Sequence, residues 1–152
     1  MPKVSIVTDS TAYLPDELTR QFKITILPLS IIWDGQSYLD GVDIQPEQFY
    51  ERLQHAGTLP TTSQVTSPSI QKAFGGLLNK GNDVLGIFLS SKFSGTFEAA
   101  IQAREMFPSA RGKIALVDSR LTTMAMGLPV LATARAALAG GSAEPRHYSA
   151  RF

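Results

Sequence analysis

Short hydrophobic runs alternate along the chain with longer segments that favour helices. Runs typical of β-strands lie at residues 3–7, 84–89 and 113–117, where aliphatic and β-branched residues cluster. Helix-forming residues, apolar spacing and N-terminal caps predict helices at residues 15–22, 46–54, 68–79, 96–107 and 128–139. Strands that alternate with helices predict an α/β fold, with a mainly parallel open sheet and helices on both faces.

A β-hairpin is expected within this alternation. Residues 24–33 are rich in Ile and Leu, and they are followed by Asp34 and Gly35. This dipeptide suits the positive φ angles of a type I′ turn. Residues 36–39 therefore predict the second arm of the hairpin.

Two segments of the chain show no regular pattern. Residues 57–66 are expected to be irregular, and Ser67 is expected to cap the helix that follows them. From residue 140 onward both helical and strand periodicity disappear. The sequence thus predicts one α/β domain at residues 1–139 and an irregular tail at residues 140–152.

Composition narrows the classes of protein to which the chain can belong. Its 152 residues include 14 Lys and Arg against 13 Asp and Glu, and this net charge of +1 argues against a dedicated nucleic-acid surface. The absence of cysteine excludes thiolate chemistry and cysteine-bound zinc. Apolar stretches are too short to span a membrane, and the first residues leave no room for a signal peptide, so a cytoplasmic protein is expected.

Polar loops supply the candidate binding residues. Three of them follow predicted parallel strands, and the fourth precedes a helix: residues 8–11, 90–96, 118–123 and 60–64. Because the carboxyl ends of parallel strands meet at one edge of a sheet, we expect these loops to lie together where α/β proteins bind ligands. They are rich in hydroxyls and nearly free of candidate catalytic bases.

The segment Ser94-Gly95-Thr96 is the strongest candidate among these loops. At the start of a helix, amide hydrogens, hydroxyls and the helix dipole all favour one anion, and Gly95 permits its close approach. Simple capping of the helix by Ser94 explains the same residues equally well. For Asp9 and Ser10, turn formation and capping are the favoured interpretation.

Several signatures of common enzyme classes are missing from the chain. It contains no phosphate-binding loop, dinucleotide fingerprint, nucleophile elbow or zinc-protease helix. His55 is expected to end a helix and His147 lies in the predicted tail, so neither is placed beside a serine. The scattered acids, such as Asp40 and Asp43, lack a recognised metal-ligand spacing. We therefore expect no catalytic residue, no bound metal and no cofactor.

Three apolar side chains flank the polar loops. Phe93, Met124 and Met126 are candidates for lining an apolar pocket. Packing in an ordinary hydrophobic core is the more frequent role of such residues.

Five motifs stand in order along the chain: VTDSTAYLP at 7–15, IIWDGQSYLDGVDI at 31–44, PTTSQ at 60–64, LSSKFSGTFEAA at 89–100 and VDSRLTTMAMG at 117–127. Together they resemble the DegV family of bacterial fatty-acid-binding proteins. The resemblance covers residues 3–139 and corresponds to the N-terminal domain of a two-domain protein. It implies a long-chain fatty acid bound between the domains, and in some relatives its presentation to an ATP-using fatty-acid kinase.

The same resemblance implies which residues hold the carboxylate of the fatty acid. Thr62 and Ser94 would be its main ligands, with Ser63, Gly95 and Thr96 close by. Neutral donors suit a carboxylate that must later react, because they hold it without a tight ion pair.

Two features depart from the family pattern. Residues 123–125 replace a small Ser-Met-Gly run, so a different local backbone is expected there. The second domain is absent, which suggests a truncated chain with an exposed apolar face and a tendency to self-associate.

Two alternatives to a fatty-acid-binding protein remain open from the sequence. One is a magnesium-dependent phosphoryl-transfer or hydrolase domain, in which the amides at residues 94–96 hold phosphate and Asp9 or Asp118 holds the metal. The other is a remnant that folds but binds nothing because its partner half is missing.

Overall fold

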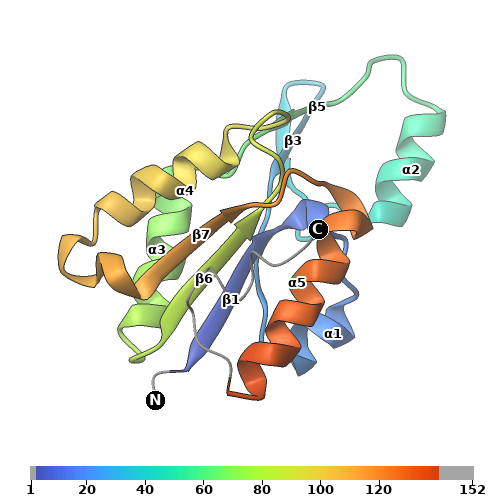
Figure 1. Ribbon diagram of the computed structural model, residues 1–152. Helices are drawn as coiled ribbons and strands as arrows, with labels where there is room; N and C mark the ends of the chain where they lie inside the picture. Colours follow the sequence, from blue (N-terminus) through green and yellow to red (C-terminus); the bar gives the residue numbers. More distant parts are fainter. Residues whose placement is uncertain (1–2, 141–152) are drawn as a thin grey trace.

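A four-stranded parallel sheet forms the centre of the protein (Figure 1). The computed structural model describes residues 3–140. The strands lie in the order β2 (Thr25–Leu27), β1 (Val4–Asp9), β6 (Asp83–Phe88) and β7 (Ile114–Asp118), and every neighbouring pair is parallel. This arrangement confirms the predicted α/β class.

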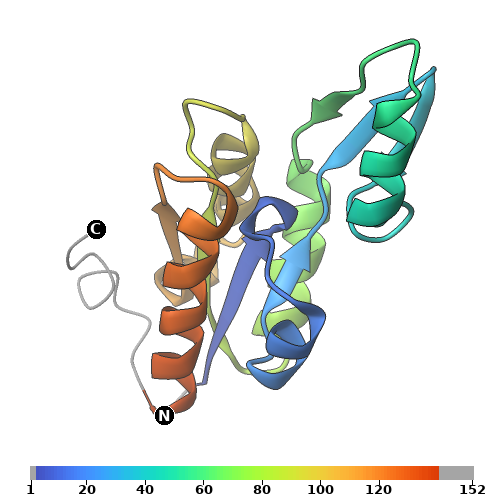
Figure 2. The same ribbon diagram turned by 90° about the vertical axis from the view of Figure 1, so that its right-hand side faces the viewer.

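Helices cover both faces of the parallel sheet (Figures 1 and 2). On one face lie α1 (Asp16–Gln21) and α5 (Thr123–Leu138), and on the other lie α3 (Ser67–Leu78) and α4 (Thr96–Glu105). The short 3-10 helices η1 (Ser10–Ala12) and η2 (Pro108–Lys113) follow β1 and α4.

The alternation of side chains along the strands produces two hydrophobic cores. On β1, Ile6 packs toward α1 and α5, whereas Val7 packs toward α3 and α4. On β6, Leu85 packs in the core with α1 and α5, and Phe88 packs in the core with α3 and α4. Strands buried on both faces explain why these runs are hydrophobic throughout rather than alternating with polar residues.

A smaller antiparallel unit extends from the parallel sheet (Figure 2). Its strands are β4 (Gln36–Leu39), β3 (Ser30–Trp33) and β5 (Thr61–Ser63), and α2 (Pro46–Gln54) belongs to the same unit. The predicted hairpin is confirmed, with φ angles of 51° and 74° at Asp34 and Gly35.

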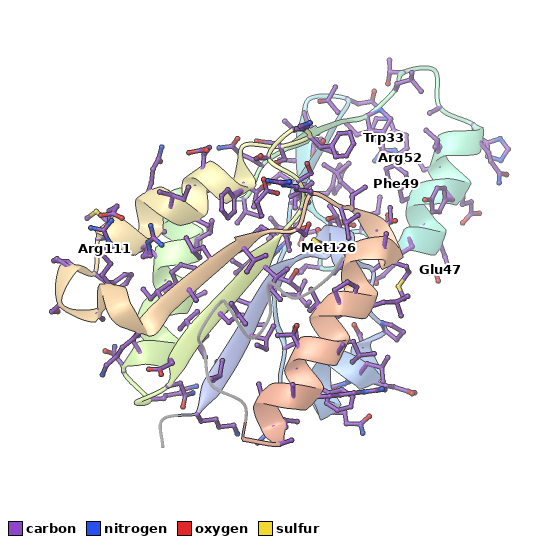
Figure 3. The ribbon with its side chains drawn as sticks, in the orientation of Figure 1. Trp33, Glu47, Phe49, Arg52, Arg111 and Met126 are labelled. Atoms are coloured by element: carbon purple, nitrogen blue, oxygen red, sulfur yellow. The ribbon has the colours of Figure 1, made fainter. Side chains whose placement is uncertain are left out.

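An aromatic cluster holds α2 against the hairpin (Figure 3). Trp33 is fully buried, and its ring centre lies 5.3 Å from that of Phe49. The guanidinium carbon of Arg52 lies 4.4 Å from the Trp33 ring centre, and the side chain also forms an ion pair with Asp34. The unit thus has a small core of its own, separate from the two cores of the sheet.

Four of the sequence-based boundaries need correction. The run 24–33 is divided near Pro28 between β2 and β3, which belong to different sheets. The expectation that residues 57–66 are irregular was wrong, because β5 pairs with β3 there. Helix α5 begins at residue 123 instead of 128. The N-cap of α3 is Thr66 rather than Ser67, and its hydroxyl accepts a hydrogen bond from the Ser69 amide at 3.4 Å.

Two further expectations concern the ends of the domain and the membrane. Helix α5 ends at residue 138, and the predicted tail, with His147, lies beyond the described residues apart from its first position. Within residues 3–140 we find no helix with the length and apolar character needed to cross a bilayer.

Candidate functional site

Asp9 connects the ends of two neighbouring strands at the carboxyl edge of the sheet. Its buried carboxylate accepts hydrogen bonds from the Thr11 amide at 3.0 Å, the Thr11 hydroxyl at 2.6 Å and the Leu89 amide at 2.9 Å. Burial raises the pKa of Asp9, and these hydrogen bonds partly oppose the shift. The Ser10 hydroxyl accepts from the Leu29 amide at 3.1 Å. Asp9 therefore has the capping role favoured from the sequence, since it is the N-cap of η1, whereas the Ser10 hydroxyl instead connects the end of β1 to the segment after β2.

Asp118 has a similar role at the end of β7. It accepts from the Ser91 hydroxyl at 2.6 Å, the Ser91 amide at 3.2 Å and the Arg120 amide at 3.0 Å. Partial burial would raise the pKa of Asp118, but the hydrogen bonds from Ser91 and Arg120 lower it below its ordinary value. This carboxylate fastens the loop after β6 to the loop after β7.

The Ser94-Gly95-Thr96 turn stands at the start of α4, as the sequence predicts. Gly95 is the N-cap, and the Ser94 hydroxyl accepts from the Thr96 amide at 3.2 Å, so Ser94 also serves the helix end. The Ser94 and Thr96 hydroxyl oxygens are 2.9 Å apart, and Thr96 Oγ1 accepts from the Val65 amide at 3.2 Å. When Thr96 donates its hydroxyl hydrogen to Ser94, the hydrogen of Ser94 is left to address a ligand.

The end of the PTTSQ motif, residues 60–64, contacts this turn. A Cβ atom on Gly95 would overlap the carboxamide of Gln64, 2.9 Å from its carbon. Together with the hydrogen bond from Val65 to Thr96, this contact joins two segments about 30 positions apart in the sequence. Gln64 is therefore a residue of this region that the sequence analysis did not single out. Its position in PTTSQ was a signal, but only the structure reveals the contact with Gly95.

Strand β5 separates two of the predicted carboxylate ligands. In the antiparallel pairing of β5 with β3, Thr62 lies opposite Ile31 and Ser63 lies opposite Ser30. Successive side chains of a strand point to opposite faces, so Thr62 and Ser63 cannot both turn toward one ligand while β5 keeps this geometry. Both are exposed, and Thr62 lies on the face that carries Ile31.

The three apolar candidates differ in accessibility. Phe93 is 73% exposed and Met124 is 40% exposed, so both have surface available to a ligand. Met126 is completely buried between α5 and the sheet (Figure 3), in the core that contains Val4 and Leu85. Its position is that of an ordinary core residue.

The backbone at the start of α5 has an unusual conformation. Thr123, the first residue of the segment that departs from the family pattern, has a φ angle of 58°. This left-handed region is costly for a β-branched residue. The departure noted in the sequence therefore coincides with local strain.

Features expected of a metal-dependent or histidine-dependent enzyme have little support in residues 3–140. In this part of the chain no group of three or more His, Asp and Glu side chains is arranged to hold a metal ion. The oxygens of Asp9 and Asp118, the candidate ligands, already accept hydrogen bonds from the protein. His55 is the C-cap of α2, as expected for a residue that ends a helix.

The fold and this edge define a class of protein: a parallel α/β domain whose strand ends carry hydroxyl and amide donors. The chain matches the model of the DegV family, described as uncharacterised proteins, over residues 3–147. It belongs to the DegV family.

Relatives of known sequence and structure agree with this assignment. A DegV domain-containing protein of Caldanaerobacter subterraneus is 42% identical over 95% of this chain and 50% of its own length. The DegV family protein of Thermus thermophilus, described as binding fatty acid, has a TM-score of 0.83 and 28% identity, with coverage of 92% and 49%. DegV of Bacillus subtilis, described as a fatty acid binding protein, has a TM-score of 0.84 and 31% identity, with coverage of 97% and 51%.

This chain spans about half the length of the relatives that it matches. A protein of Eubacterium ventriosum, described as binding stearic acid, shows the same relationship, with 31% identity, a TM-score of 0.83 and coverage of 93% of this chain and 49% of its own.

Proposed function

We propose that this chain is one half of a fatty-acid-binding protein and holds the carboxylate of a long-chain fatty acid at the carboxyl edge of its sheet. Thr62 and Ser94 are the main ligands, and Gly95 and Thr96 lie beside them. Ser63 is close in the chain, but its side chain lies on the other face of β5 from Thr62, so it is not a ligand together with Thr62. The observation that carries the proposal is the contact of residues 64 and 65 with residues 95 and 96, which joins the two motifs at one place. The fatty-acid binding described for relatives of the same fold supports it.

The acyl chain contributes more to the affinity than the head group. Roughly 14 methylenes at about 0.8 kcal/mol each give on the order of 11 kcal/mol before the cost of association. Each hydrogen bond to the carboxylate adds about 1.5–3 kcal/mol. Phe93 and Met124 supply part of the apolar wall in this proposal, and the other half of the protein supplies the rest. The half described here alone should bind fatty acid weakly and self-associate through its exposed apolar face.

The proposed role is that of a carrier and not of an enzyme. The candidate edge offers hydroxyls and amides, whereas its two central carboxylates, Asp9 and Asp118, are engaged in holding loops. A carrier of this kind would present the carboxylate to an ATP-using fatty-acid kinase, and the cytoplasm is the compartment that supplies ATP.

Stearate binding tests the proposal directly. The full 152-residue chain, produced in bacteria, is examined by native mass spectrometry for co-purified fatty acid and by calorimetry for stearate binding. We expect Ser94→Ala or Thr62→Ala to weaken binding about tenfold or more, as the loss of one charge-assisted hydrogen bond requires. Ser109→Ala, which removes an exposed hydroxyl in η2, is the matched control.

The outcomes distinguish the three hypotheses for the chain. Repeated absence of bound fatty acid from the wild-type protein would identify a remnant. Hydrolysis of phosphate esters that depends on magnesium would identify an enzyme. Equal weakening by Ser94→Ala and Ser109→Ala would place the carboxylate elsewhere.

A further inference from the structure

A cavity lies at the edge of the parallel sheet where the strands begin, opposite the candidate carboxylate site. Its volume is about 380 Å³, and its walls come from the starts of β1 and β2 and from the ends of α1, α3 and α5. Figures 1 and 2 show the start of β1 beside the end of α5 at this lower edge. The candidate carboxylate site is at the other end of the strands, so the two sites are separate.

Three lysines from different parts of the chain line this cavity: Lys3, Lys23 and Lys80. No Asp or Glu is among the lining residues, and within residues 3–140 none of the three ammonium groups forms an ion pair. Asp83 pairs with Val4 in the sheet but does not line the cavity. The residues around the cavity therefore include three exposed cations and no carboxylate.

The negative C-termini of the neighbouring helices balance only part of the positive charge of the three lysines. Three helices end beside the cavity, and each C-terminus carries about −0.5 of an elementary charge, against +3 from the lysines. The last carbonyls of α3 are already satisfied by the backbone, since Leu77 accepts from the Asn82 amide at 3.2 Å and Leu78 from the Gly81 amide at 2.9 Å. The lysine ammonium groups are therefore not needed to satisfy these two carbonyls at the end of α3.

The remaining polar residues of the cavity add hydrogen-bond donors. Asn82 donates one amide hydrogen to the Ser5 hydroxyl at 3.0 Å, which fixes its side chain and leaves its second hydrogen available. Lysine acts as a compact point charge and binds phosphate without the planar geometry of arginine. A cavity of this volume is within the range of sites for small molecules.

We infer that this cavity binds a small soluble anion with a phosphoryl or diphosphoryl group, held by Lys3, Lys23 and Lys80 with Asn82 as an additional donor. Several oxygens and at least two negative charges match three lysines that come from three separate segments of the chain, before β1, after α1 and after α3. The bound anion would fasten the ends of α1 and α3 to the start of β1.

Titration of the full chain with inorganic pyrophosphate, at constant ionic strength and followed by NMR of the backbone amides, tests this inference. We expect saturable changes at Lys3, Lys23, Lys80 and Asn82. The double variant Lys23→Gln/Lys80→Gln should lose about tenfold or more in affinity, because it removes two of the three cations.

The control is Lys113→Gln, which removes one exposed cation at the end of η2, just before β7 and outside the cavity. Because Lys113→Gln changes a single residue, it is compared with the single variant Lys80→Gln. We expect Lys80→Gln to weaken pyrophosphate binding more than Lys113→Gln does. Equal effects of these single variants, or shifts spread over all lysines without saturation, would overturn the inference. Stearate binding should be the same in all variants, so this result is independent of the proposed function.

Discussion

The carboxamide of Gln64 occupies the space beside Gly95 that any larger residue would need for its Cβ atom. The backbone of Gly95, with φ −75° and ψ 5°, is open to other residues, so the requirement for glycine is one of space and not of conformation. This contact keeps the PTTSQ segment close to the start of α4. Its integrity is a condition for the proposed carboxylate site.

Gly95→Ala should therefore weaken stearate binding several-fold with little change in stability. The added methyl displaces the flexible Gln64 side chain, which costs little, but it also moves the proposed ligands apart. In a Gln64→Ala background the same substitution should have almost no further effect, because the overlap is gone. Calorimetric titration of the two single variants and the double variant measures this coupling.

Gly57→Ala is the control for that series, since a Cβ atom there has open space and the backbone is not left-handed. Additive losses in the double variant would show that Gln64 and Gly95 act independently.

Thr96→Val should destabilise the protein by about 1–3 kcal/mol. The substitution keeps the volume of a fully buried side chain but leaves the Val65 amide without its acceptor. It also frees the Ser94 hydroxyl from its partner at 2.9 Å, so stearate affinity should fall as well. Urea denaturation gives the first quantity and calorimetry the second. Thr133→Val, at another buried threonine on α5, provides the comparison, and an equal loss there would remove the special role of Thr96.

The parallel sheet could be predicted because its strands are hydrophobic on both faces and alternate with helices. The antiparallel unit was harder to predict in full. Residues 61–63 are polar and exposed, and they form a strand only because β3 offers an edge for pairing. Such pairing depends on contacts between distant segments, which periodicity within a short window does not reveal.

The sequence predicted that the loops at residues 60–64 and 90–96 lie together, and the contacts of residues 64 and 65 with residues 95 and 96 agree with it, whereas a carboxylate site there stays a prediction. Spacing and residue type identified Ser94, Gly95 and Thr96, but not the overlap of Gln64 with Gly95, which depends on how α3 and α4 pack. The alternation that separates Thr62 from Ser63 was hidden because β5 was not expected. Met126 was ambiguous between pocket and core because an apolar side chain beside a loop fits both.

Asp9 should make stability depend on pH with an unusual sign. Because its pKa is raised in the folded protein from an ordinary value of 3.8, the folded state binds more protons than the unfolded state between these two values. The contribution of the protonated group is fully present below 3.8 and is lost as pH rises through the raised pKa. Urea denaturation across this range should show the wild-type protein losing stability relative to Asp9→Asn, which does not titrate. A relative gain with rising pH would show that hydrogen bonds from Thr11 and Leu89 outweigh burial.

Two helical glycines should respond to alanine in opposite directions. Gly76, on the exposed side of α3, has nothing within 4 Å of an added Cβ atom, so Gly76→Ala should raise the free energy of unfolding by about 0.5–1 kcal/mol through helix propensity. Gly127, on α5, faces the backbone of Ala12, whose carbonyl carbon would lie 3.3 Å from the added atom while the carbonyl oxygen overlaps it. A backbone group cannot move aside as a side chain does, so Gly127→Ala should lower stability by about 1–3 kcal/mol despite the same gain in propensity. Urea denaturation of both variants measures the difference, and a stabilising Gly127→Ala would mean that α5 does not pack against η1 this closely.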